Sequence, residues 1–284
     1  MDFAILATIL INGICTGGVY GLTASAFSFQ LGALRIVNFS YGAFLMVAMY
    51  AVFLLVHHAK ISLWVAGLAF MPVFALLGWV LRRFLVTTVR DEIQILMTMG
   101  LAIIFENAAL FIWGSFPRSL SVIEQGFEIG GIYIGLTRLG LLALSAVILL
   151  GFHLFLTRTW LGMAIRAMVQ TRDAAVVVGV DTQKIACLAF AVSSGIVAMA
   201  AALLMALFSV EPGSGGYYLL LGFLVTVLGG QGNLWGSFLA GCLIGIISAV
   251  TMFLNPGMHD TVIFMSFILA LLIRPYGLFG TKEK

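Results

Sequence analysis

Long, uninterrupted apolar segments are the feature of this sequence that most restricts its fold. A bilayer core about 30 Å thick is crossed by about 20 apolar residues in a helix. Inside lipid the backbone finds no outside hydrogen-bond partner, so a spanning segment is either helical or part of a closed barrel. A barrel would show alternating segments of about 10 residues, whereas these apolar runs are continuous. We therefore predict an all-α, polytopic bundle of transmembrane helices.

Nine segments fit this description, and only 9% of the residues are charged, against about 25% in soluble domains. The segment at 218–230 is too short to cross comfortably, so the predicted number of crossings is eight or nine. We expect one membrane domain over residues 1–284. The predicted spans are 3–30, 36–56, 61–81, 94–114, 139–157, 186–209, 218–230, 236–254 and 260–275.

The basic residues indicate an orientation. Most of the 14 Lys and Arg residues lie in the loops 82–93 and 158–185 and in the C-terminal tail. If the nine spans alternate, these segments share one face, and the positive-inside rule makes that face cytoplasmic. The C-terminus is then inside and the N-terminus outside, which favours nine crossings. The stretch 115–138 becomes an external loop.

Two glycine-interrupted segments resemble one another, at 31–43 and 228–237. Each breaks an apolar run with glycine, contains an asparagine, and resumes as a helix rich in small residues. Paired interruptions of this kind in a transporter indicate discontinuous helices near the translocation path. Alternatively, the glycines simply permit close helix packing, as in the GxxxG at 241–245. The candidates for lining or gating a path are Asn38, Phe39, Ser40, Gly42, Gly229, Gly230 and Asn233.

Glu106 lies in the middle of a predicted span. A carboxylate at this depth costs about 2.5 kcal/mol or more, so it must face the protein interior, find a partner or be protonated. One hypothesis makes it a contact for a substrate amino group or a gate. The other makes it a structural hydrogen bond to another helix.

The predicted cytoplasmic loop 158–185 is far more charged than the rest of the chain. Its residues from about 162 to 178 have helical composition, and a short exposed helix with small residues lets another protein approach closely. Gly179 suits a C-cap position. The residues that would form such a docking surface are Arg166, Ala167, Gln170, Asp173, Ala174 and Gly179.

Four motifs in register resemble the permeases of ABC importers for branched-chain amino acids (the LivH type). Asp173-Ala-Ala-Val-Val-Val-Gly179 is similar to their EAA-xxx-G pattern, with Asp in place of Glu. Arg35-Ile-Val-Asn-Phe-Ser-Tyr-Gly42 resembles R-x-V/I-N-F-A-H-G, and Leu228-Gly-Gly-Gln-Gly-Asn233 resembles L-G-G-x-G-S/N. Arg274-Pro-Tyr-Gly-Leu-Phe-Gly280 resembles R-P-x-G-L-F/L-G. Tyr41 departs from the usual His, and Glu106 occupies a position that is usually Gln.

This resemblance implies a permease subunit in a bacterial inner membrane. Its expected partners are two ABC ATPase subunits docked at 158–185, a second permease subunit (related or identical) and an external solute-binding protein. The implied solute is a branched-chain or other hydrophobic amino acid, or a small amide such as urea. The chain itself would need no cofactor, because the ATPase subunits bind ATP and Mg²⁺.

Missing motifs narrow the mechanism. The sequence has no G-x-x-x-x-G-K-[ST] and hence no P-loop. We find no Ser/His/Asp arrangement or paired carboxylates that indicate an enzyme, and His259 has no obvious acid–base partner. The three cysteines and the histidines predict no metal site, and a net charge of +3 is no signal for nucleic acid. The alternative to an ABC permease is an ion-coupled secondary transporter with Glu106 as its coupling site.

Overall fold

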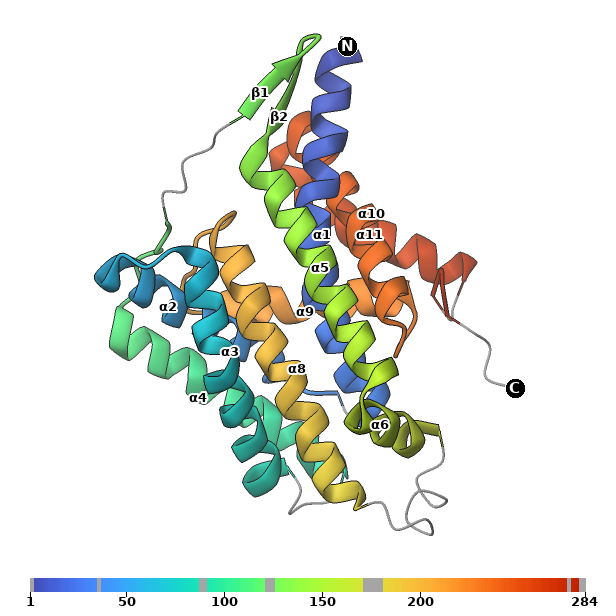
Figure 1. Ribbon diagram of the computed structural model, residues 1–284. Coiled ribbons are helices and arrows are strands. Elements are labelled where there is room, and N and C mark those ends of the chain that lie inside the picture. Colours follow the sequence, from blue (N-terminus) through green and yellow to red (C-terminus); the bar gives the residue numbers. More distant parts are fainter. Residues whose placement is uncertain are drawn as a thin grey trace. The chain divides into compact units, whose positions relative to one another are not determined.

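The computed structural model describes residues 3–34, 37–86, 91–120, 126–170, 181–274 and 277–280. Within these ranges the chain is almost entirely helical (Figure 1). Its two strands, β1 (Gly126–Ile129) and β2 (Ile132–Gly135), form an antiparallel hairpin in which Gly126 faces Gly135. The α-helices are α1 (Phe3–Leu34), α2 (Tyr41–Ala59), α3 (Leu63–Leu81), α4 (Asp91–Trp113), α5 (Leu136–Arg158), α6 (Trp160–Gln170), α8 (Thr182–Met205), α9 (Ser214–Gly229), α10 (Leu234–Leu254) and α11 (His259–Ile273).

Each of the nine predicted spans corresponds to a helix, which confirms the polytopic all-α fold. In the described part of the chain, eight helices are long and apolar enough to cross a membrane. The ninth, α9, has 16 residues and a length of about 24 Å, so it is shorter than a bilayer core. A π-helical turn (Arg82–Val86) follows α3, and a 3₁₀ turn (Pro256–Met258) precedes α11.

The chain forms two compact units. Unit 1 comprises Met1–Ser28, Ser121–Leu149 and Leu221–Lys284, and unit 2 comprises Phe29–Leu120 and Leu150–Leu220. Helices α10 and α11 lie within unit 1, and helices α2, α3, α4, α6 and α8 lie within unit 2. We describe each unit by itself.

Helix α8 is the core of unit 2, because nearly every residue from Ile196 to Met205 is buried. Helix α3 lies along it (Figure 1). Small residues bring the two helices together: a Cβ on Gly67 would lie 2.8 Å from the Met199 sulfur, and one on Gly195 would lie 3.1 Å from the Met71 carbonyl oxygen. Such contacts are typical of helices that associate in membranes, where backbones approach through small side chains.

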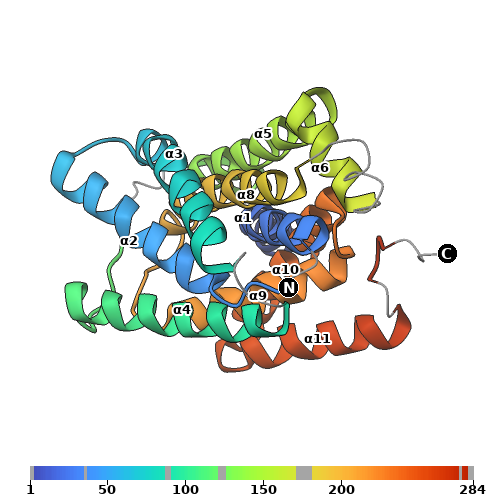
Figure 2. The same ribbon diagram turned by 90° about the horizontal axis from the view of Figure 1, so that it is seen from below.

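Helices α2 and α4 run side by side and in the same direction within unit 2 (Figure 2). The ring of Phe44 lies 6.2 Å from that of Phe105, and Tyr50 stacks on Trp113 at 4.5 Å between ring centroids. Most of the other side chains of α4 are exposed and apolar, as expected of a helix that faces lipid.

In unit 1, the glycines of α1 pack directly against the backbone of α10. A Cβ on Gly13 would lie 2.9 Å from the Cα of Ile246, and one on Gly17 would lie 2.6 Å from the Cα of Cys242. A Cβ on Gly21 would lie 2.6 Å from the carbonyl oxygen of Phe238. The order of these contacts makes the two helices antiparallel. The GxxxG at 241–245 therefore does serve packing, and its partner is a second series of glycines at the same spacing.

Candidate functional site

The first helix break, between α1 and α2, is organised by Asn38. Its side-chain oxygen accepts hydrogen bonds from the backbone N–H of Ser40 (3.1 Å) and from the Ser40 hydroxyl (2.7 Å). Its amide nitrogen donates to Gln30 Oε1 at 3.1 Å. The backbone N–H of Phe39 donates to the Thr98 hydroxyl of α4 at 3.3 Å. Asn38, Ser40 and Gln30 are all buried. These bonds therefore satisfy backbone N–H groups that the helix break would otherwise leave without a partner.

Gly42, Gly215 and Glu106 meet at one junction in unit 2. A Cβ on Gly42 would overlap the carbonyl oxygen of Gly215, so the starts of α2 and α9 touch through their backbones. A Cβ on Gly215 would lie 3.0 Å from Glu106 Oε1 and 2.8 Å from the Cα of Ala43. Glu106 is half-buried, and it forms no hydrogen bond or ion pair with any residue that the structure describes. Its carboxylate is therefore available to a ligand.

The second helix break, between α9 and α10, lies in unit 1 and is a glycine turn. Gly230 and Gly232 have φ of +90° and +80°, a left-handed conformation that glycine adopts at no steric cost. Asn233 then caps α10, since its side-chain oxygen accepts from the backbone N–H of Gly236 at 3.0 Å. The N–H of Gly232 donates to the Ser28 hydroxyl of α1 at 3.0 Å.

The C-terminal segment 277–280 packs on this second break. The N–H of Leu278 donates to the carbonyl of Leu228 at 2.7 Å, and the Asn233 amide donates to the carbonyl of Phe279 at 3.0 Å. Gly280 approaches Gly230 so closely that a Cβ on Gly230 would lie 2.7 Å from the Gly280 Cα. Two motifs that are separate in the sequence therefore form one structure.

We expect Asn233→Ala to lower the free energy of unfolding by about 1–2 kcal/mol, because it removes a helix cap and the bond to Phe279. Asn233→Ser is the matched control: a serine oxygen still caps α10 but does not reach Phe279, so its loss should be smaller. Thermal unfolding midpoints in detergent measure both. Equal midpoints for the two variants and the parent chain would contradict this role.

Helix α6 lies where the docking helix was predicted, and it is amphipathic. Ala164, Ile165 and Met168 are buried, whereas Arg166 and Ala167 are exposed. On the exposed side, Trp160 and Met163 are 70% and 50% exposed. Helix α6 therefore presents a face of large apolar, small and basic side chains.

Helix α6 is fixed firmly to α5. The Thr159 hydroxyl accepts from the Gly162 N–H at 3.1 Å and thereby caps α6, and Arg166 Nη2 donates to the carbonyl of Thr157 at 3.3 Å. A Cβ on Gly162 would overlap the backbone of Leu156. Helix α6 is thus held against the end of α5 by backbone and side-chain contacts.

The remaining predicted docking residues are only partly described. Gln170 ends α6, and Asp173, Ala174 and Gly179 lie outside the described residues. Beyond them, Asp181 caps α8 by accepting from the Lys184 N–H at 3.0 Å. This bond, with the Lys184 ammonium at 3.0 Å, lowers the pKa of Asp181 below its ordinary value. The cap is therefore present at neutral pH and is lost as the pH falls through that lowered pKa.

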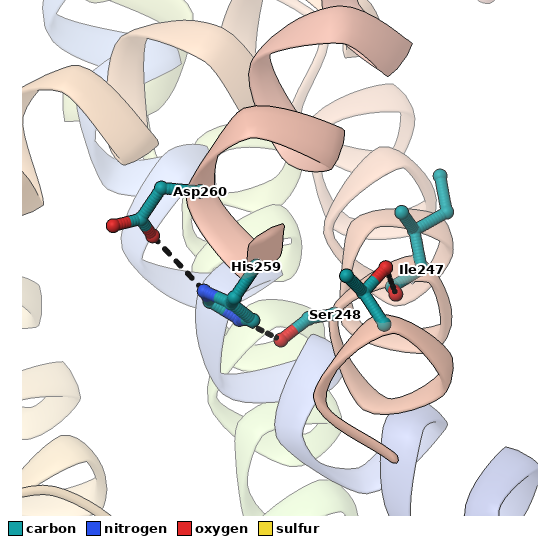
Figure 3. A network of polar contacts seen from close by, with 5 residues as sticks. Ile247, Ser248, His259 and Asp260 are labelled. Atoms are coloured by element: carbon teal, nitrogen blue, oxygen red, sulfur yellow. Dashed lines mark hydrogen bonds and ion pairs between the residues drawn. The ribbon is translucent and has the colours of Figure 1, made fainter. Parts of the chain in front are cut away.

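His259 joins α10 to α11 in unit 1 (Figure 3). Its Nε2 lies 2.7 Å from the Ser248 hydroxyl and its Nδ1 lies 2.9 Å from Asp260 Oδ1. The prediction that His259 has no obvious acid–base partner is therefore wrong. The arrangement does not look like a hydrolase site, since a nucleophilic serine needs access and oxyanion donors. Ser248 is buried within α10, so the three residues link the two helices instead.

The chemistry of this link fixes the histidine tautomer. An ionised carboxylate only accepts, so the proton of neutral His259 lies on Nδ1, and Nε2 accepts from Ser248. We expect His259→Ala and Ser248→Ala each to lower the free energy of unfolding by about 0.5–1.5 kcal/mol. The double variant should lose less than the sum of the two single losses, because both single variants remove the same hydrogen bond. Ser266→Ala, which removes only a bond within α11, is the control. A ¹⁵N spectrum showing protonated Nε2 in the neutral ring would contradict the assignment.

Comparisons with known proteins agree with this architecture. Residues 9–271 match the family described as "Branched-chain amino acid transport system / permease component". The permease protein BraD of Pseudomonas aeruginosa is 26% identical, over 96% of this chain and 95% of its own length. The permease protein LivH of Escherichia coli K12 is 26% identical over the same shares, and a probable LivH of Methanocaldococcus jannaschii is 25% identical over 88% of this chain and 85% of its own length.

No solved structure matches the chain significantly. The ion-coupled alternative receives no support from these relatives, all of which are named as transport-system permeases. The family match covers all the described helices of both units except the first residues of α1 and the last of α11. The chain is a multi-pass membrane protein and belongs to the permease-component family of branched-chain amino acid transport systems.

Proposed function

We propose that this chain imports a branched-chain or other hydrophobic amino acid, as one permease subunit of an ATP-driven importer. The observation that carries the proposal is the family match over residues 9–271, because its relatives are named as high-affinity branched-chain amino acid permeases. A small amide such as urea remains the second candidate solute from the sequence resemblance.

The importer we propose combines this chain with three further components. Two ATPase subunits bind ATP and Mg²⁺, a second permease subunit (identical or related) completes the pore, and an external solute-binding protein delivers the solute. The membrane is a bacterial inner membrane, with the N-terminus outside and the C-terminus in the cytoplasm. The concentration of basic residues in the loops 82–93 and 158–185 supports this orientation.

Force from the ATPase pair would enter at α6. Its exposed face offers Arg166 and Ala167 to a cleft on an ATPase subunit, and its backbone contacts with α5 carry the movement into the membrane. The two helix breaks would then move between outward-open and inward-open states. Asn38, Phe39, Ser40 and Gly42 belong to the first break, and Gly229, Gly230 and Asn233 belong to the second.

Glu106 would contact the amino group of the solute. It is an unpaired carboxylate beside the backbone junction of Gly42 and Gly215, and a membrane-embedded acid of this kind calls for a partner. We expect Glu106→Leu, which removes the acceptor oxygens, to lower leucine uptake by about tenfold while leaving basal ATP hydrolysis intact. The same substitution should have little effect on uptake of a solute without an amino group.

Reconstitution tests the proposed function. The chain is assembled with its ATPase and partner permease subunits in proteoliposomes, and uptake of labelled leucine and ATP hydrolysis are measured with and without the loaded binding protein. We expect uptake only with ATP and the binding protein. Uptake driven by a proton or sodium gradient, with no ATPase present, would overturn the proposal.

A further inference from the structure

At one end of unit 2, backbone pairing brings an arginine and a glutamate to neighbouring positions. The backbones of Arg118 and Val210 exchange two hydrogen bonds, each 2.8 Å long, so the segment after α4 runs beside the segment before α9. Glu211 follows Val210 directly. The side chains of Arg118 and Glu211 are both exposed.

These two charges do not neutralise one another. Arg118 Nη2 donates to the carbonyl of Trp113 at 3.4 Å, and this is a weak bond to a neutral group. Among the residues that the structure describes, neither Arg118 nor Glu211 forms an ion pair. The chain therefore carries an arginine and a glutamate at neighbouring backbone positions, and neither charge is paired with a described residue.

Aromatic side chains lie beside this pair. Tyr50 is fully buried and stacks on Trp113 with an interplanar angle of 14°, and Tyr218 of α9 is also buried. Trp113, on which the Tyr50 ring stacks, also supplies the carbonyl oxygen that accepts from Arg118. The Tyr50 hydroxyl has no hydrogen-bond partner. Buried hydroxyls without a partner are rare, and this one has a hydrogen bond to donate to a ligand.

We propose that Arg118, Glu211 and Tyr50 form a binding site for the zwitterionic head group of an α-amino acid. Arg118 would bind the carboxylate, since a guanidinium matches its planar geometry. Glu211 would accept from the ammonium, the Tyr50 hydroxyl would donate to the carboxylate, and the aromatic rings would lie against an apolar side chain. This inference rests on the proposed function for the source of the amino acid, and it places a first solute contact at that end of unit 2.

The same charges could instead dock the external binding protein. The observations favour a small ligand, because the Tyr50 hydroxyl is buried and the surface of a folded protein does not enter such a position. Protein docking is therefore an outcome that the test must separate.

Equilibrium binding of labelled L-leucine to the assembled complex in nanodiscs, without the binding protein, tests the site. We expect saturable binding that Arg118→Gln and Glu211→Gln each weaken by about tenfold or more, and that Tyr50→Phe weakens by a few-fold. Isoamylamine lacks the carboxylate. It should displace the labelled leucine as well as unlabelled leucine does in Arg118→Gln, but not in the parent complex. 4-Methylpentanoate, which lacks the amine, should do so in Glu211→Gln only. Glu128→Gln, an exposed carboxyl on β1, should bind leucine as the parent complex does.

Three results would overturn this inference. The first is no saturable binding to the parent complex up to millimolar leucine. The second is unchanged binding in both charge variants. The third is weaker capture of the loaded binding protein by those variants with leucine binding unchanged, which would indicate protein docking. If the parent complex still imports leucine with ATP, any of these results overturns the binding site and leaves the proposed function intact. If the parent complex imports no leucine, the proposed function itself fails.

Discussion

Replacing Gly17 with leucine is expected to prevent the chain from accumulating as a folded protein. A Cβ at this position would lie 2.6 Å from the Cα of Cys242 and 2.6 Å from the carbonyl oxygen of Gly241. Both obstacles are backbone atoms of α10, so no side chain can rotate out of the way. Helices α1 and α10 would have to separate, and the contacts of Gly13 and Gly21 would be lost with them.

The size of the effect should scale with the added side chain. Overpacking of a tight interface typically costs about 1–3 kcal/mol, which is the loss we expect for Gly17→Ala. Leucine should exceed the whole stability of a marginal protein, about 5–15 kcal/mol. Yield of monodisperse protein by fluorescence-detected size exclusion, followed by thermal unfolding midpoints, measures both variants.

Gly140 in α5 provides the matched control. A Cβ there would meet no atom within 4 Å, so Gly140→Ala should be neutral or slightly stabilising, because alanine favours helix over glycine by about 1 kcal/mol. If Gly17→Leu folded as well as Gly140→Leu, direct backbone packing between α1 and α10 would be refuted.

Replacing Ala167 with tryptophan is expected to uncouple ATP hydrolysis from transport. Ala167 lies on the exposed face of α6, where the proposed ATPase partner docks. An indole in place of a methyl group would hold the two proteins apart, and losing about 1.4 kcal/mol of contact energy changes an equilibrium tenfold. We expect leucine uptake per ATP hydrolysed to fall about tenfold or more, with hydrolysis retained.

The measurement is the ratio of uptake to hydrolysis in the same proteoliposomes. Ala108→Trp places the same side chain on an exposed position of α4, where lipid accommodates it, and should keep the parent ratio. An unaltered ratio in Ala167→Trp would show that this face of α6 does not transmit force.

Lipid makes the helices of such a chain easy to predict. Because every backbone group in a spanning segment must be satisfied internally, an apolar run dictates a helix whatever its neighbours are. Even the short segment at 218–230 proves helical, and the helix begins earlier, at Ser214, despite two glycines in its first turn. Both helix breaks were equally visible, since glycine and asparagine interrupted apolar runs at 31–43 and 228–237.

Long-range partners were much harder to predict. The spacing of Gly13, Gly17 and Gly21 was a readable signal, yet nothing local to α1 named α10 as their partner. Ser248 and His259 are 11 residues apart, and only the turn between two helices brings them together. Asn38 and Asn233 were proposed for the solute path, and their visible bonds serve the helix breaks. The roles of Glu106, Arg166 and Ala167 in transport stay predictions.

The docking of residues 277–280 on the second break has a consequence for how the protein is made. Asn233 finds its partner Phe279 46 residues later in the chain, and the carbonyl of Leu228 accepts from the N–H of Leu278. During synthesis, α9 and α10 therefore leave the translation machinery with their connecting turn incomplete. The two bonds to 277–280 can form only after α11 has been made, so a ribosome stalled within α11 should leave a nascent chain whose 229–233 turn is more easily cut by protease than in the finished protein.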